Sequence, residues 1–154
     1  MAYMIPFALA LPQNEKTVNA RGLILNDEQD VPNDSYQFLE WYCPNPSCDC
    51  FQVLLKVFAI QQDTIAAYIY VPFLPTASPF LDPVEPVTPT ALALLKIVTE
   101  HLQEDPIYIK RLQNHYWQVR SVASNPKHPA YSAVTHWAAN GAATPTSKPR
   151  RKKR

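Results

Sequence analysis

The sequence predicts an α+β fold in which an antiparallel β-sheet is followed by two C-terminal helices. Apolar and aromatic segments with the alternation typical of strands occupy much of residues 18–73. Two helix-start signals, each a capping residue followed by proline, come later in the chain. A proline-rich segment separates these two regions. The strands are therefore expected to form one sheet, with the helices packed on one of its faces.

Four segments are expected to form strands. Residues 18–25 (VNARGLIL) are short and partly apolar, whereas residues 36–43 (YQFLEWYC) place aromatic side chains on both faces of a pleated strand. Residues 51–60 (FQVLLKVFAI) are almost continuously apolar, which is typical of a central strand that is buried on both faces. A short polar connection leads to residues 65–73 (IAAYIYVPF), and its length predicts an antiparallel hairpin.

Six prolines lie between residues 72 and 89. Proline lacks a backbone N–H and fixes φ, so this segment can form neither a helix nor a central strand. A proline-rich segment can bind the aromatic groove of a partner protein. A crossover from the sheet to the helices is the commoner use, and we expect the segment to run extended over the surface in that role.

Thr88 before Pro89 and Asp105 before Pro106 are the two helix-start signals. Apolar residues follow each of them at spacings of three and four, which predicts two amphipathic helices. The expected inner face of the first helix consists of Leu94, Ile97, Val98, His101 and Leu102. The expected inner face of the second consists of Tyr108, Leu112, His115, Val119 and Val122.

Residues 1–124 are expected to form a single domain, a size sufficient for one hydrophobic core. Residues 125–139 lose helical periodicity and predict an irregular extension, and residues 140–154 predict a disordered basic tail. The tail contains six of the fourteen Lys and Arg residues, whereas all thirteen acidic residues precede it. An acidic body therefore carries a basic tail.

The compartment is expected to be the cytoplasm. No segment approaches the roughly 20 apolar residues of a membrane-spanning helix, and the apolar N-terminus lacks the positive charges of a signal peptide. An odd number of closely spaced cysteines is also more typical of a protein from a reducing compartment than of a secreted protein held by disulfides.

All three cysteines, Cys43, Cys48 and Cys50, lie in the segment YCPNPSCDC at residues 42–50. The turn-forming residues between two expected strands predict a hairpin tip that brings the sulfurs together. Three thiolates suit zinc, and less well iron or Cu(I), because these ions prefer soft ligands. Two alternatives remain open at this point: ordinary buried thiols, and a redox or nucleophilic cysteine.

A tetrahedral zinc ion needs a fourth ligand, and His115 is the first choice because it borders the apolar face of the second expected helix. His101 comes next for the same reason, and His128 and His136 follow. Asp49 is expected to point away from the two cysteines beside it. A helix-face histidine also commonly hydrogen-bonds a neighbour. Three cysteines and one histidine would fill the coordination shell of a structural zinc ion.

The segment YCPNPSCDC and the later segment DPIYIKRLQNHYWQVR together resemble a group of uncharacterised bacterial proteins. That group has a Tyr-Cys-x-x-Pro-x-Cys-Asp-Cys signature and a distal Tyr-x-x-Arg-Leu-x-x-His-Tyr helix. The resemblance covers about a quarter of the chain. It implies that Cys43, Cys48, Cys50 and His115 belong together, and it implies no activity.

The expected function is that of a small zinc-binding protein, a binding or scaffold module for an unknown protein partner, rather than an enzyme. A metal-dependent hydrolase with an open coordination position, using Asp49 or a histidine as its base, is one alternative. A nucleic-acid-associated protein is another, since a basic tail can neutralise phosphates. The tail residues concerned are Lys148, Arg150, Arg151, Lys152, Lys153 and Arg154.

Overall fold

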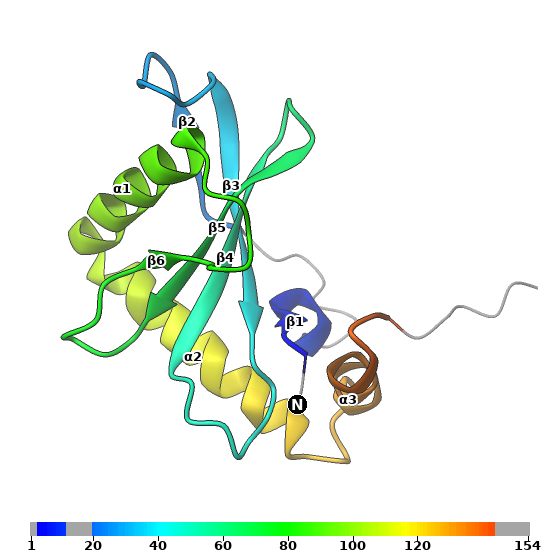
Figure 1. Ribbon diagram of the computed structural model, residues 1–154. Helices are drawn as coiled ribbons and strands as arrows, with labels where there is room; N and C mark the ends of the chain where they lie inside the picture. The colour runs from blue at the N-terminus through cyan, green and yellow to red at the C-terminus, as the bar shows by residue number, and fades with distance from the viewer. Residues whose placement is uncertain (1–2, 12–19, 144–154) are drawn as a thin grey trace, which may run out of the picture.

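A computed structural model of the chain describes residues 3–11 and 20–143 (Figure 1). In this part of the chain a six-stranded antiparallel sheet is followed by three α-helices, which confirms the predicted α+β class. The strands are β1 (Ile5–Pro6), β2 (Gly22–Leu25), β3 (Asp34–Tyr42), β4 (Gln52–Ala59), β5 (Thr64–Pro72) and β6 (Phe80–Leu81). The helices are the 3₁₀ turn η1 (Phe7–Ala10) and the α-helices α1 (Pro89–Glu104), α2 (Pro106–Ala123) and α3 (Tyr131–Asn140).

Strands β3, β4 and β5 are sequential antiparallel neighbours in the sheet, and β6 adds a short edge beyond β5. β2 and β1 share the other edge, because each pairs with a different part of β3. β2 lies opposite Asp34–Gln37, and β1 lies opposite Trp41 and Tyr42. The end of β3 that leads into the cysteine segment is therefore paired on both sides, by β1 and by β4.

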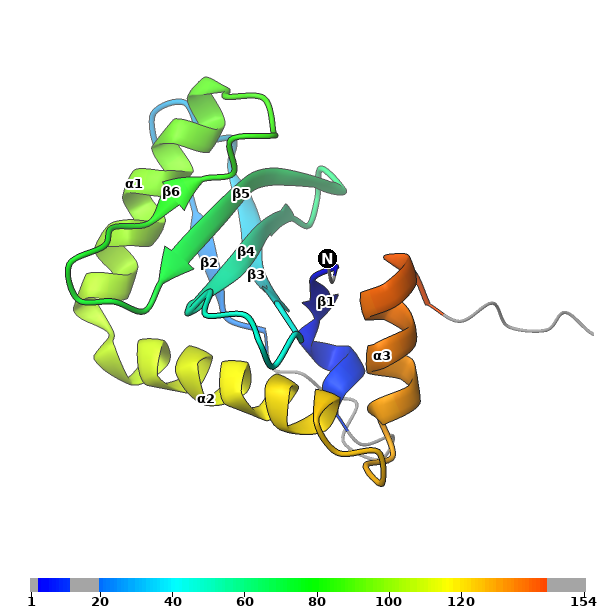
Figure 2. The same ribbon diagram turned by 60° about the horizontal axis from the view of Figure 1, so that its bottom comes forward.

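Helices α1 and α2 cover one face of the sheet (Figures 1 and 2). Every second residue of β3 is buried, which is the alternation expected of a strand with one face on the core. Phe38 lies beside His101 of α1 and Tyr108 of α2, and the hydroxyl oxygen of Tyr42 lies 3.1 Å from the carbonyl oxygen of Leu112. The core thus lies between this face and the two helices.

Both helix-start signals function as the sequence predicts. The side chain of Thr88 accepts a hydrogen bond from the N–H of Ala91, and that of Asp105 accepts one from the N–H of Tyr108, each at 3.0 Å. Asp105 also forms an ion pair with Arg21, next to β2, which links the start of α2 to the sheet. None of the described helices combines the length and the apolar character needed to cross a membrane.

Helix α3 differs from the irregular extension expected over residues 125–139. The helix is short and has no side-chain N-cap, so local signals are weak. Tertiary contacts stabilise it instead, because Val134 is fully buried and the ring of Trp137 lies 5.8 Å from that of Trp41. It ends at Gly141, whose φ of 71° is in the left-handed region that glycine adopts readily.

Three further elements, β1, η1 and β6, had no sequence signal. β1 and η1 form from the apolar N-terminal segment, and α3 and α2 both contact η1. Strand β6 interrupts the proline-rich crossover with a two-residue ladder on the edge of the sheet, where proline neighbours are tolerated.

Asp34 is buried at the start of β3 and organises the turn between β4 and β5. Its carboxylate accepts hydrogen bonds from the backbone N–H groups of Ser35, Gln61 and Gln62, and from the side-chain amide of Gln62. Loss of hydration acts to raise the pKa of Asp34, but these hydrogen bonds outweigh it and hold the pKa below its ordinary value of 3.8.

We predict that Asp34→Asn lowers the free energy of unfolding in a pH-dependent way. Because the folded-state pKa is depressed, the contribution of Asp34 is fully present above pH 3.8 and is lost as the pH falls through the folded-state pKa. Urea unfolding of both proteins from neutral to acidic pH measures this. The exposed Asp27→Asn is the matched control. A difference between wild type and Asp34→Asn that does not change with pH would contradict the assignment.

Candidate metal centre

The loop between β3 and β4 carries all three cysteines. Cys43 directly follows β3, and Cys50 comes two residues before β4 begins. Between them the chain reverses at Asn45, whose side-chain oxygen accepts a hydrogen bond from the N–H of Ser47 and whose carbonyl accepts one from the N–H of Cys48. Asparagine commonly forms turns of this kind through its side chain.

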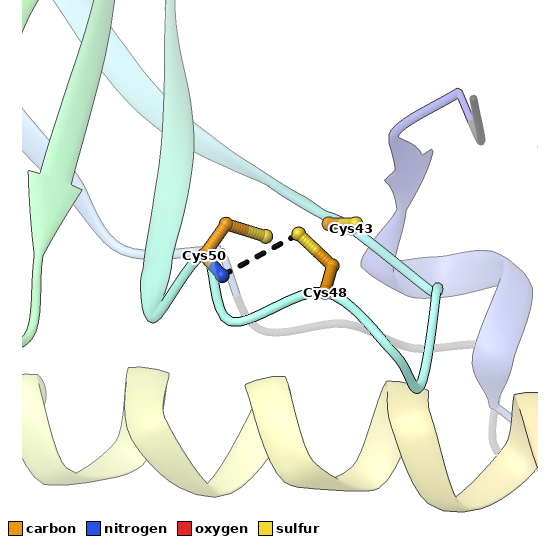
Figure 3. Close-up of side chains that lie close together, drawn as sticks. All are labelled: Cys43, Cys48 and Cys50. Atoms are coloured by element: carbon orange, nitrogen blue, oxygen red, sulfur yellow. Dashed lines mark hydrogen bonds between the residues drawn. The ribbon is translucent and has the colours of Figure 1, made fainter.

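The reversal brings the three sulfurs together. The Sγ atoms of Cys43, Cys48 and Cys50 lie within 4.8 Å of one another, and all three cysteines are free thiols (Figure 3). The sulfurs of Cys48 and Cys50 point toward one another, and the N–H of Cys50 donates a 3.4 Å hydrogen bond to the Sγ of Cys48. Bonds of about 2.3 Å around a tetrahedral zinc ion place sulfurs about 3.8 Å apart. The arrangement is thus close to the one that a metal ion would require.

The thiols of Cys48 and Cys50 are not electrostatically equivalent. Hydrogen bonds from the thiol and the backbone N–H of Cys50 lower the pKa of Cys48, and the Cys43 thiol and the charge of Arg120 add to this effect. Burial raises the pKa of Cys50, and its contacts with the other two thiols raise it further. Of the Cys48 and Cys50 thiols, that of Cys48 therefore ionises more readily in the absence of a metal.

Arg120 of α2 is the residue of this site that sequence analysis missed. Its Nη1 donates a hydrogen bond to the carbonyl of Cys48, and its Nη2 lies 3.5 Å from the Sγ of Cys50. A signal for it does exist, because Arg120 continues the four-residue series of the buried Tyr108, Leu112 and Tyr116. A charged residue in such a series is expected to be buried with a partner.

The structure does not bring His115 into the three-cysteine group. Its Nδ1 lies 2.7 Å from Oε1 of the buried Glu40, and its ring stacks on that of Phe7 at 3.9 Å. The hydroxyl of Tyr42 donates a hydrogen bond to the same Glu40 oxygen. This position on α2 therefore faces η1 and β3, whereas Arg120 reaches the cysteine loop.

The other candidate ligands also lie outside the group. His101 packs against the rings of Phe38 and Tyr108 in the core. The Nδ1 of His128 accepts a hydrogen bond from the N–H of Ala130, and His136 lies next to Asn140 on α3. Asp49 is exposed in the loop, which agrees with the expectation that it points away from its cysteine neighbours. The basic residues 148–154 lie outside the described part of the chain.

Comparison with known proteins yields no matching family model, no similar curated protein and no similar solved structure. The proposed function therefore rests on the geometry and chemistry of the site itself.

We predict that His115→Ala lowers the free energy of unfolding of the metal-free protein by about 1–3 kcal/mol, because the buried Glu40 carboxylate loses one of the two hydrogen-bond partners that it has among the described residues. Urea unfolding in the presence of a chelator measures this, with His136→Ala on α3 as the control. A His115→Ala protein with unchanged metal-free stability but weakened metal binding would instead make His115 a ligand.

Proposed function

We propose that the chain is a zinc-binding protein in which Cys43, Cys48 and Cys50 hold a structural ion that fixes the β3–β4 loop. The observation that supports this most is the convergence of the three sulfurs to within 4.8 Å of one another without a disulfide. A binding or scaffold module needs a surface of fixed shape, and the ion would supply this for a loop that has no regular structure of its own.

The chemistry of the donors favours zinc over other ions. Thiolates are soft ligands that suit zinc, iron centres and Cu(I). Zinc imposes no geometric preference through d-electrons and commonly binds several cysteines in structural sites. The neighbouring hydrogen-bond donors, the N–H of Cys50 and the guanidinium of Arg120, both stabilise negative charge on the sulfurs.

Ordinary buried thiols explain the arrangement less well. Free cysteine in a core behaves as a small apolar residue and packs against other apolar side chains. Here all three cysteines are only partly buried, and their sulfurs face one another beside a guanidinium group. This environment is polar, which favours ligands over packing residues.

The fourth coordination position distinguishes a structural ion from a catalytic one. His115 as the fourth ligand stays a prediction, and because its ring nitrogens do not join the group of sulfurs within 4.8 Å, the imidazole or the loop would have to move. Its contact with Glu40 uses Nδ1 and could persist, since histidines that bind zinc through Nε2 commonly donate the other ring N–H to a carboxylate. A hydrolase would need an open position together with a nearby general base. Among the described residues no histidine, aspartate or glutamate joins the three-cysteine group, and Asp49 is exposed. The structural role proposed here rests on the donor set, because several cysteine ligands are typical of structural zinc sites.

We predict that the purified protein contains zinc at an ion-to-chain ratio of about one. Cys43→Ser, Cys48→Ser and Cys50→Ser should each weaken binding strongly, because each removes a thiolate ligand. Elemental analysis after dialysis measures the ratio, and Ser47→Ala, an exposed residue of the same loop, is the matched control. Zinc content that survives all three cysteine substitutions would refute the site.

We also predict that a structural ion raises the free energy of unfolding of the protein. Zinc at about 100 times its Kd should add about 2.7 kcal/mol to the free energy of unfolding, since it binds the folded chain preferentially. Chelation should reverse this gain. A hydrolase would instead keep its stability under chelation and lose turnover, which would favour the alternative function.

A further inference from the structure

We infer that Arg120 is the positioning residue of the metal centre and supplies its counter-charge. This inference rests on the proposed function, because it assigns a role in metal binding to a side chain that is not itself a ligand. It identifies helix α2 as the element that holds two of the three ligands in place.

Arg120 contacts the part of the β3–β4 loop that carries Cys48 and Cys50. One end of the guanidinium donates a hydrogen bond to the carbonyl of Cys48, and the other lies 3.5 Å from the Sγ of Cys50. A planar guanidinium offers its donors in a fixed fork, so the two contacts restrain the backbone at one cysteine and the sulfur at the next. Both ligands are therefore oriented by one side chain.

The burial of Arg120 shows that its charge requires compensation. The residue is only 8% exposed, and its Cζ lies 4.4 Å from the centre of the Tyr116 ring. Arginine does not deprotonate in proteins, and a buried charge is unfavourable unless it is paired. Within the described residues, no carboxylate forms an ion pair with Arg120, and its Nε has no hydrogen-bond partner. Among the described residues, the groups beside it that could carry an opposite charge are the cysteine sulfurs, which become thiolates when they bind a metal ion.

A zinc ion bound by the three cysteines would balance the positive charge of Arg120. Three thiolates around a divalent cation leave the centre with one net negative charge, which the single positive charge of Arg120 offsets. Outer groups that hydrogen-bond to ligands orient them and tune the metal, and they contribute strongly to affinity. The loaded centre and Arg120 together are neutral, so the buried guanidinium is matched when the ion is bound.

The test compares zinc affinity in wild type, Arg120→Met and Arg120→Lys by competition with a chromophoric chelator. Arg120→Met removes both the charge and the hydrogen bonds, and it should weaken binding by about 10- to 100-fold. Arg120→Lys keeps the charge but lacks the fork, so its affinity should lie between the two. Lys110→Met, which removes an exposed charge from the same helix, should bind zinc like the wild type.

A second readout separates a role at the metal from a role in folding alone. In the cobalt-loaded protein, the thiolate-to-cobalt charge-transfer band should shift in Arg120→Met, because the Cys50 sulfur loses its hydrogen bond. A variant with lower metal-free stability but wild-type zinc affinity and an unshifted band would overturn the inference. If Arg120→Met does not fold, Arg120→Lys decides by the same two measurements. Absence of zinc binding in the wild type would instead refute the proposed function itself.

Discussion

In the hairpin of β3 and β4, Trp41 lies opposite Leu54, and this register sets the two ends of the loop that holds the three cysteines. The register is strongly constrained, because a slip of one residue would turn the buried side chains of β3 away from the core. β1 pairs with the same end of β3 and secures it from the other side. The position of Cys43 relative to Cys50 therefore follows from the packing of the sheet.

Helix α2 connects this loop to the core. Its Tyr108, Leu112 and Tyr116 are buried against the sheet, and the next residue in that series, Arg120, contacts the loop. One helix thus contributes both to the core and to the candidate site. An ion bound between the sulfurs would couple the loop to α2, and its binding free energy would then contribute to folding.

Much of the fold could be predicted because local signals were strong, as at Thr88 and Asp105, which cap the two helices. The convergence of the cysteines followed from turn-forming residues between two clear strands. Helix α3 could not be predicted, because its formation depends on contacts of Val134 and Trp137 with distant parts of the chain. The surroundings of His115 could not be predicted either, since residue spacing alone does not reveal that Glu40 and Phe7 lie against it.

The proposed site requires the three sulfurs to bind one metal ion. X-ray absorption at the zinc edge of the purified protein tests this most directly, because it reports the atoms bound to the ion and their distances. Three sulfur scatterers at about 2.3 Å are expected. A zinc shell made only of nitrogen and oxygen, or a protein that retains no metal, would contradict the proposed site.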